Sequence, residues 1–315
     1  MEAEADMSAI VALSVLVSSF WLTFLMIPPI ISFSFKKGLL DAPGASELKA
    51  HKAPVPYLGG IGIFLGFFIP AAFIRFVLRG PGELSVIFIC SLSLAVLGAL
   101  DDHKNIRPKI RLLGQLAIAS ATVLFLIKAG KHFPFGYPGI LMMIFFIIAT
   151  INSVNLLDGL DGLAGGAMSI SLAGFSIIFF LKGDPAFMLL ALALLGATCG
   201  FLPYNFNPAK VFMGDNGSIF LGYLISVFAI RASSGSPVLF FITLALIGLP
   251  VVDTSTAVIR RFLKRKPLMK GDRDHLYDRL MGTGLSVKKT VLICYGIQIF
   301  LVSCSLLGLR GLRLI

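Results

Sequence analysis

The chain has 315 residues, of which 57% are hydrophobic and only 14% are charged. A water-soluble protein of this length carries about 25% charged residues, so a soluble globular fold is excluded. The formal net charge of +11 is explained by membrane orientation and contact with anionic lipid, and it requires no nucleic-acid partner.

Long apolar runs recur along the chain, and each approaches the roughly 20 residues that a helix needs to cross a bilayer. Lipid forces the backbone of each span to satisfy its own hydrogen bonds, so we expect helices. The ten predicted spans are 8–35, 58–79, 84–100, 111–128, 139–157, 163–181, 186–203, 217–232, 237–262 and 289–309. No repeat, low-complexity tract or soluble domain interrupts them. The sequence therefore predicts an all-α polytopic membrane protein with a single domain, residues 1–315.

Lysine and arginine are divided unequally between the two sets of loops that these spans define. One set, which includes the long loop after the ninth span, carries 19 of the 27 basic residues, and the other carries eight. Because cytoplasmic loops carry an excess of lysine and arginine, we expect the richer set to be cytoplasmic. Both termini would then lie outside.

The most polar end of any apolar run is that of the fifth span. Asn152, Asn155, Asp158 and Asp161 follow one another at intervals of three, so neighbouring members share one slowly drifting stripe of a helix. One acid alone would need no function, since a helix end reaches water. Four polar groups in register beside such an apolar run indicate a wet interior site.

Further acids fall on the same predicted side of the membrane. Asp101 and Asp102 close the third span, Asp215 opens the eighth, and Asp253 lies in the ninth. Acids gathered this closely repel one another, so a cation is expected among them. Oxygen ligands without a Cys or His cluster indicate Mg²⁺, or alternatively Mn²⁺, rather than Zn²⁺.

The loop before the second span adds positive charge on that side. Lys49 and Lys52 precede Gly59 and Gly60, which open the span with bare backbone. A helix start beside lysines can bind an anion, but paired glycines also allow close helix packing, and the sequence leaves both open. Acids, a divalent ion and lysines on one face predict phosphoryl transfer at a membrane surface.

Together, several stretches resemble the polyprenyl-phosphate N-acetylhexosamine-1-phosphate transferase superfamily, glycosyltransferase family 4. They are KAPVPYLGG (52–60), LGALDDHKNIRPKIRLLGQ (97–115), NSVNLLDGLDGLAGG (152–166), NFNPAKVFMGDNGS (205–218), PVVDTSTAVIRR (250–261) and DRDHLYDRL (272–280). The resemblance implies ten helices with both termini outside, in agreement with the charge distribution. It also implies a multi-pass protein of the bacterial inner membrane with its active site facing the cytoplasm, and leaves a homodimer open.

The resemblance assigns roles to particular residues. Asp215 falls on the family's Mg²⁺ ligand, and Asp101 and Asp102 fall on the paired acids proposed to activate the lipid phosphate. His275 is taken as the third catalytic residue, from the family's last motif. The implied substrate contacts are Lys52, Lys109, Asn155, Asp158, Asp161, Asn205, Phe212 (placed to stack on uracil) and Arg273.

The implied reaction joins two substrates at the membrane. The phosphate oxygen of a polyprenyl phosphate attacks the β-phosphate of a UDP-sugar, UMP leaves, and a polyprenyl-diphospho-sugar remains, the first membrane step of a cell-envelope glycan pathway. The sugar is expected to be an N-acetylhexosamine, and UDP-GlcNAc is favoured because the triple histidine of the pentapeptide-translocase branch is absent. The last motif reads His275-Leu276-Tyr277-Asp278 where GlcNAc-type members carry His-x-His-His, so the sugar stays open.

Three other classes of membrane protein share some of these features. An ion-coupled transporter, the main alternative, places polar helix breaks near the bilayer midplane, often in two repeated halves, whereas these acids lie at predicted helix ends. An intramembrane aspartyl protease requires Gly-x-Gly-Asp, and this chain has Met-Gly-Asp. A CDP-alcohol phosphatidyltransferase requires Ala-Arg where this chain has Gly165-Gly166.

Overall fold

A computed structural model describes residues 2–42, 53–77, 79–130, 135–233, 235–265 and 274–311, with side chains from residue 9 onward. Its helices are α1 (Glu2–Lys37), α2 (Gly59–Phe76), α3 (Glu83–Lys104), α4 (Pro108–Lys128), α5 (Gly136–Leu157), α6 (Leu163–Leu181), α7 (Pro185–Asn205), α8 (Gly214–Ser233), α9 (Pro237–Leu244), α10 (Gly248–Leu263), α11 (Leu276–Gly282) and α12 (Val287–Gly311). Two short strands, β1 (Leu40–Asp41) and β2 (Val55–Pro56), pair antiparallel.

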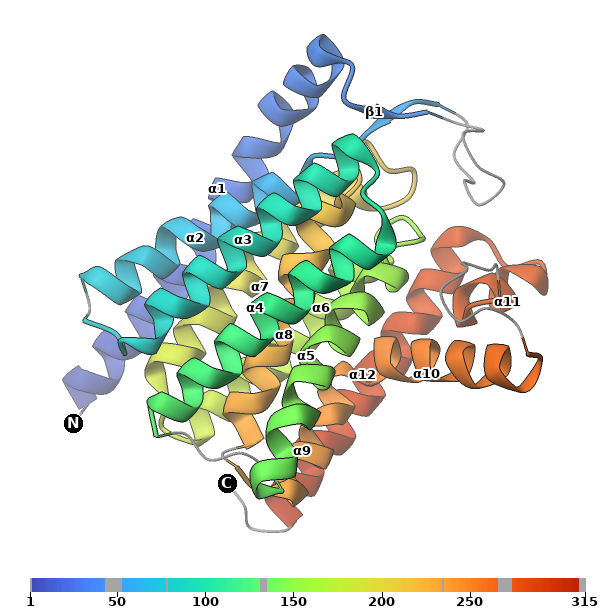
Figure 1. The fold of residues 1–315 in the computed structure, drawn as a ribbon. Coiled ribbons are helices and arrows are strands. Elements are labelled where there is room, and N and C mark those ends of the chain that lie inside the picture. Colours follow the sequence, from blue (N-terminus) through green and yellow to red (C-terminus); the bar gives the residue numbers. More distant parts are fainter. Residues whose placement is uncertain are drawn as a thin grey trace.

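Ten helical segments in the described part of the chain are long and apolar enough to cross a membrane, which confirms the predicted number. They form one bundle, and the start of α1 and the end of α12 lie at the same end of it (Figure 1). The C-terminal ends of α3 and α5 and the N-terminal end of α8 lie at the opposite end, so the acidic motifs are brought to one face.

Helix α8 is the centre of the bundle. About 94% of its most apolar 18-residue stretch is buried inside the protein. Helices α3, α5, α2, α9 and α6 pack around it. Close approach depends on glycine: a side chain at Gly222 would overlap the backbone of Ile151 in α5, and one at Gly217 would overlap Gly60 in α2. Because glycine lets two backbones meet in this way, the first turn of α8 is held at a fixed depth between its neighbours.

The ninth predicted span, 237–262, is not one continuous helix. A 3₁₀ turn, Ala245–Ile247, separates α9 from α10, and Figure 1 shows α10 running across the bundle axis, with α11 beside it. Gly248 and Pro250 follow the turn directly, and both residue types weaken a continuous α-helix. Gln298 of α12 supports the bend, since its Oε1 accepts from Leu249 N at 3.0 Å and its Nε2 donates to Leu246 O at 2.7 Å.

Candidate active site at the ends of α3, α5 and α8

Acids and amides from separate helices meet at the end of the bundle that lies away from the termini. Asp101 and Asp102 lie in the last turn of α3, Asn155 lies in the last turn of α5, Asp158 follows that helix, and Asp215 lies in the first turn of α8. The predicted convergence of these motifs is therefore present in the fold. Their individual contacts divide them into different roles.

Asp102 holds the start of α8. Its Oδ1 accepts from the backbone N–H of Asp215 at 2.9 Å, and its Oδ2 accepts from the N–H of Asn216 at 2.9 Å and from the Asn216 side-chain amide at 2.6 Å. The first N–H groups of a helix have no partner within the helix, and an acid there also stabilises the helix dipole. All of these contacts go to α8, so we infer that Asp102 positions Asp215.

Asp215 is held by amide and guanidinium donors. Its Oδ1 accepts from Asn155 Nδ2 at 2.6 Å, and that same amide also donates to Ser218 Oγ at 2.9 Å. Its Oδ2 lies 3.2 Å from Nη1 of Arg111, which also lies 2.8 Å from Asp101 Oδ2. Asp101 is buried, and its Oδ1 accepts from the N–H of Ile106 at 2.8 Å.

Arg111 was not among the predicted site residues, and Lys109 was. In the structure Lys109 is exposed, whereas Arg111 is partly buried against the acids. Residues two apart on a helix point about 200° away from each other, so only one of the two can face the cluster. The sequence held one signal for this choice, since the polar residue Gln115 lies one turn beyond Arg111 on the same helix face. In the structure, Gln115 accepts a 2.8 Å hydrogen bond from Asn152 of α5, so this face is turned towards the bundle.

Asp158 lies in the turn between α5 and α6, outside the spanning segments. Desolvation raises the pKa of this carboxyl well above its usual range, and the negative charges of Asp215, Asp102 and Asp161 raise it further. Asp158 therefore retains a proton at a pH where an ordinary aspartate has lost it.

The raised pKa of Asp158 predicts a pH dependence of stability. The folded protein binds this proton more tightly than the unfolded chain, so the contribution favours folding at low pH and is lost as pH rises from about 4 towards the raised pKa. In excess chelator, the unfolding temperature of the Asp158→Asn variant should fall less over that range than that of the wild type. Parallel curves for the two proteins would contradict the assignment.

Asp161 and Asn205 do not join the acids at Asp215. Asp161 Oδ2 accepts from Asn207 Nδ2 at 2.9 Å and from the N–H of Ala209 at 3.0 Å. Asn205, which is buried, accepts from Gly162 N and donates to Val211 O, both at 3.0 Å. Both side chains shape the loop that leads into α8, and their predicted substrate contacts remain predictions.

The start of α2 is engaged in packing. Gly59 N donates to Phe212 O at 3.0 Å and Gly60 N donates to Met213 O at 2.9 Å, while Phe212 N donates to Pro56 O at 2.8 Å. These two amides therefore bond the loop before α8, which supports the packing alternative. Lys49 and Lys52 lie outside the described residues, so phosphate contact by their loop stays a prediction. Phe212 is partly exposed beside the two amides, and its predicted stacking on uracil is untested.

His275 approaches the site from the C-terminal part of the chain. It is buried, and its Nδ1 lies 2.7 Å from Oδ2 of Asp253, which is also buried. Asp253 Oδ1 accepts from Leu276 N at 2.6 Å, and the ring of Tyr277 lies parallel to the imidazole at 5.5 Å. A hydrogen bond from the imidazole to a carboxylate oxygen requires a proton on Nδ1.

Replacing His275 by alanine is expected to lower turnover at least about tenfold, or roughly 1.4 kcal/mol of transition-state stabilisation. Tyr277→Phe keeps the ring beside the imidazole and serves as the matched control, for which we expect less than a twofold change. The rate of product release from purified variants measures both. A silent His275→Ala together with an inactive Tyr277→Phe would transfer the role to the tyrosine.

Two predicted contacts, Lys52 and Arg273, lie outside the described residues. The residues that the sequence reasoning missed are Arg111, Asn216 and Asp253 as the partner of His275. The sequence places Asp253 among the acids on the predicted cytoplasmic side. Nothing in the sequence, however, indicates that it bonds a histidine 22 positions later.

The acidic cluster fits a metal ion that takes most of its ligands from elsewhere. Among the described residues, no group of three or more Asp, Glu, His or Cys side chains could by itself hold a metal. Oδ2 atoms of Asp101 and Asp215 nevertheless meet at one cationic nitrogen. Mg²⁺ usually takes one or two carboxylates and completes its octahedron with water and phosphate oxygens, so the donor set suits Mg²⁺ or Mn²⁺ bound together with a diphosphate.

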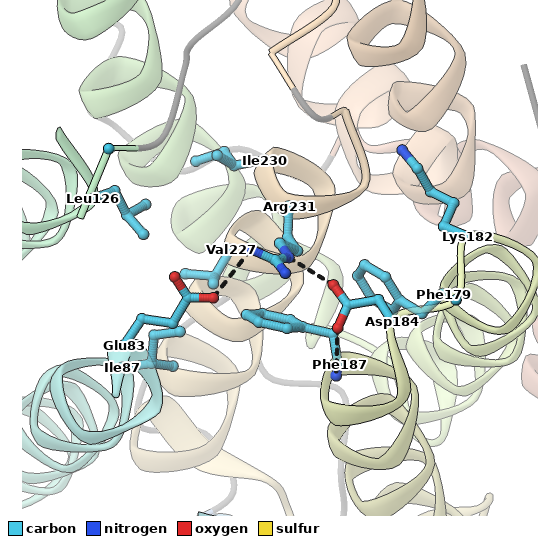
Figure 2. A pocket seen from close by; sticks show the side chains of 12 residues that line it. Glu83, Ile87, Leu126, Phe179, Lys182, Asp184, Phe187, Val227, Ile230 and Arg231 are labelled. Carbon is cyan, nitrogen blue, oxygen red and sulfur yellow. Dashed lines mark hydrogen bonds and ion pairs between the residues drawn. The ribbon is translucent and has the colours of Figure 1, made fainter. Parts of the chain in front are cut away.

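A cavity of about 450 Å³ lies at the other end of the bundle (Figure 2). Arg231 of α8 crosses it, with Nη1 3.0 Å from Glu83 Oε1 of α3 and Nε 2.7 Å from Asp184 Oδ2 before α7. Its guanidinium also lies 4.7 Å from the ring centroid of Phe187. These contacts link α3, α7 and α8 at the face away from the acidic cluster, so we assign them to packing of the bundle.

Comparison with known proteins identifies the family. The family profile described as glycosyl transferase family 4 matches residues 84–233. The chain is 36% identical over 301 residues to the probable undecaprenyl-phosphate N-acetylglucosaminyl 1-phosphate transferase of Bacillus subtilis (strain 168), covering 92% of this chain and 83% of that protein. It is 29% identical over 311 residues to the undecaprenyl-phosphate alpha-N-acetylglucosaminyl 1-phosphate transferase of Salmonella typhi, covering 91% and 81%. For the protein of the same description from Escherichia coli (strain K12), the identity is 27% over 276 residues, covering 82% and 73%.

Proposed function

The chain belongs to glycosyl transferase family 4, and on that premise we propose that it transfers N-acetylhexosamine 1-phosphate from a UDP-sugar to a polyprenyl phosphate. Undecaprenyl phosphate is the proposed acceptor and UDP-GlcNAc the proposed donor, since the names of the relatives specify that lipid and that sugar. The observation that carries the proposal is the meeting of Asp101, Asp102, Asn155 and Asp215 at one end of a membrane bundle.

The proposed reaction exchanges one phosphorus–oxygen bond for another. An oxygen of the lipid phosphate bonds to the sugar-bearing phosphorus, the bond from that phosphorus to the bridging oxygen breaks, and UMP leaves with the bridging oxygen. Mg²⁺ or Mn²⁺ held by Asp215 would supply charge neutralisation on the diphosphate. Asn155 fixes the orientation of the Asp215 carboxylate, and Asp102 fixes the helix turn that carries it.

The position of the polar groups favours this enzyme over an ion-coupled transporter. Transporter sites lie near the bilayer midplane, at interruptions within helices. Here the acids occupy the last turn of α3 and the first turn of α8, at a helix end. That position suits a soluble nucleotide sugar approaching from water and a lipid phosphate approaching from the headgroup layer.

The test is product release by the purified protein. Incubation with undecaprenyl phosphate and a panel of UDP-sugars should release UMP, most rapidly with UDP-GlcNAc, and should form a lipid-linked sugar diphosphate. Excess chelator should abolish UMP release, and Mg²⁺ or Mn²⁺ should restore it. Absence of UMP release with every sugar would contradict the function, and full turnover in chelator would contradict the metal.

We also propose that the acidic cluster faces the cytoplasm, because the loops at that end carry most of the basic residues. Gly82, between α2 and α3, and Gly282, the last residue of α11, are both exposed, and a side chain at either meets open space. In a background without the four native cysteines, Gly282→Cys should be labelled only from the cytoplasmic side and Gly82→Cys only from outside. Reversed labelling would place the acids in a compartment without UDP-sugars.

A further inference from the structure

One arginine joins two acids that come from different helices. Arg111 lies in the first turns of α4, and its Nη1 is 2.8 Å from Asp101 Oδ2 of α3 and 3.2 Å from Asp215 Oδ2 of α8. A guanidinium is never deprotonated in a protein, so this positive charge is present at every working pH. Asp101 is buried, and a buried carboxylate needs such a partner.

The same contact conflicts with the metal site of the proposed function. Asp215 Oδ1 already accepts from Asn155 at 2.6 Å, and Oδ2 carries the contact with Arg111. A divalent ion on that carboxylate and the Arg111 guanidinium, which lies 3.2 Å from its Oδ2, would repel each other. The ion and Arg111 therefore compete for Asp215.

The surroundings of Arg111 allow it to move away from Asp215. Its side chain is 25% exposed, so the guanidinium lies at the edge of the site and not in the core. The pair with Asp101 is the shorter of its two contacts and would keep the side chain at the site. Guanidinium groups bind phosphate oxygens in a two-pronged geometry, so the released nitrogen is suited to the diphosphate of an incoming UDP-sugar.

We propose that Arg111 is the internal counter-ion of Asp101 and Asp215 and that it competes with a divalent ion for the Asp215 carboxylate. With the ion bound, it acts as a positioning residue for the diphosphate. This inference rests on the proposed function only in placing the metal at Asp215. It makes a prediction about metal binding that requires no turnover.

The experiment measures Mn²⁺ binding by electron paramagnetic resonance, and unfolding temperature, on purified protein without substrates. Arg111→Gln removes the competing charge, so Mn²⁺ should bind at least about fivefold more tightly. In chelator this variant should unfold at a lower temperature than the wild type, and saturating Mg²⁺ should remove most of the difference. The ammonium of Arg111→Lys is a compact point charge without the guanidinium fork. Its Mn²⁺ affinity should therefore lie between those of the wild type and Arg111→Gln.

Arg107→Gln is the matched control, because it removes the same charge at the exposed start of α4, where no contact with the acids is formed. Its Mn²⁺ affinity should change less than about twofold. Equal or weaker Mn²⁺ binding by both Arg111 variants, or equal effects of Arg107→Gln and Arg111→Gln, would overturn the proposal. Failure to release UMP from any UDP-sugar would overturn the function instead, since the metal affinities are measured without it.

Discussion

Asp215→Asn is expected to lower UMP release by at least about a thousandfold, or roughly 4 kcal/mol of transition-state stabilisation, while the protein stays folded. The asparagine oxygen can still accept from Asn155, so the packing of α8 against α5 is retained. The asparagine NH₂ group takes the place of Oδ2, and an NH₂ group can neither ligate a divalent ion nor accept a hydrogen bond from Arg111. The loss should therefore appear in turnover and in Mn²⁺ binding more than in unfolding temperature.

The control for this variant is Asp184→Asn, which removes an acid that pairs with Arg231 at the opposite end of α8. Its turnover should remain within about twofold of the wild type, because salt screens charges that lie more than about 10 Å apart. Normal turnover by Asp215→Asn would show that this acid only starts a helix. The metal would then have to be assigned to a different carboxylate.

Asp102→Ala is expected to lower turnover about a hundredfold and to lower the unfolding temperature as well. The backbone N–H groups of Asp215 and Asn216 and the Asn216 amide all lose their acceptor. Each buried donor left without a partner costs about 1–3 kcal/mol, and the first turn of α8, which carries Asp215, is no longer fixed. Initial rates and thermal unfolding in detergent, measured on the same preparation, test both parts.

This variant also separates two roles for Asp102. The family resemblance implies that Asp102 helps to activate the lipid phosphate, whereas its contacts indicate that it positions α8. If Asp102→Ala loses activity but unfolds at the wild-type temperature, the catalytic role is favoured. A joint loss, with partial recovery of stability in Asp102→Asn, which retains one acceptor oxygen, favours positioning.

The helices of this protein could be predicted because their signal is local. A run of about 20 apolar residues crosses a bilayer as a helix wherever it occurs, since lipid offers its backbone no other hydrogen-bond partners. The exception is the bend before α10, where Gly248 and Pro250 permit a break but Gln298, about 50 positions later, helps to hold it. The acidic motifs were also recognisable, because several acids and amides in register beside an apolar run indicate a wet interior site, whereas a single acid at a helix end needs no function.

The sequence by itself thus determined the class of fold, the number of spans and the end of the bundle at which the acids gather. Only the tertiary structure decided which acid does what. Asp101 and Asp102 are adjacent in sequence, yet one pairs with Arg111 and the other caps α8. Spacing along a helix fixes which residues share a face, but the rotation of that helix against its neighbours is set by packing, here by the close approach of Gly98 to the backbone of Asp215. Because that contact spans more than a hundred residues, no local pattern encodes it.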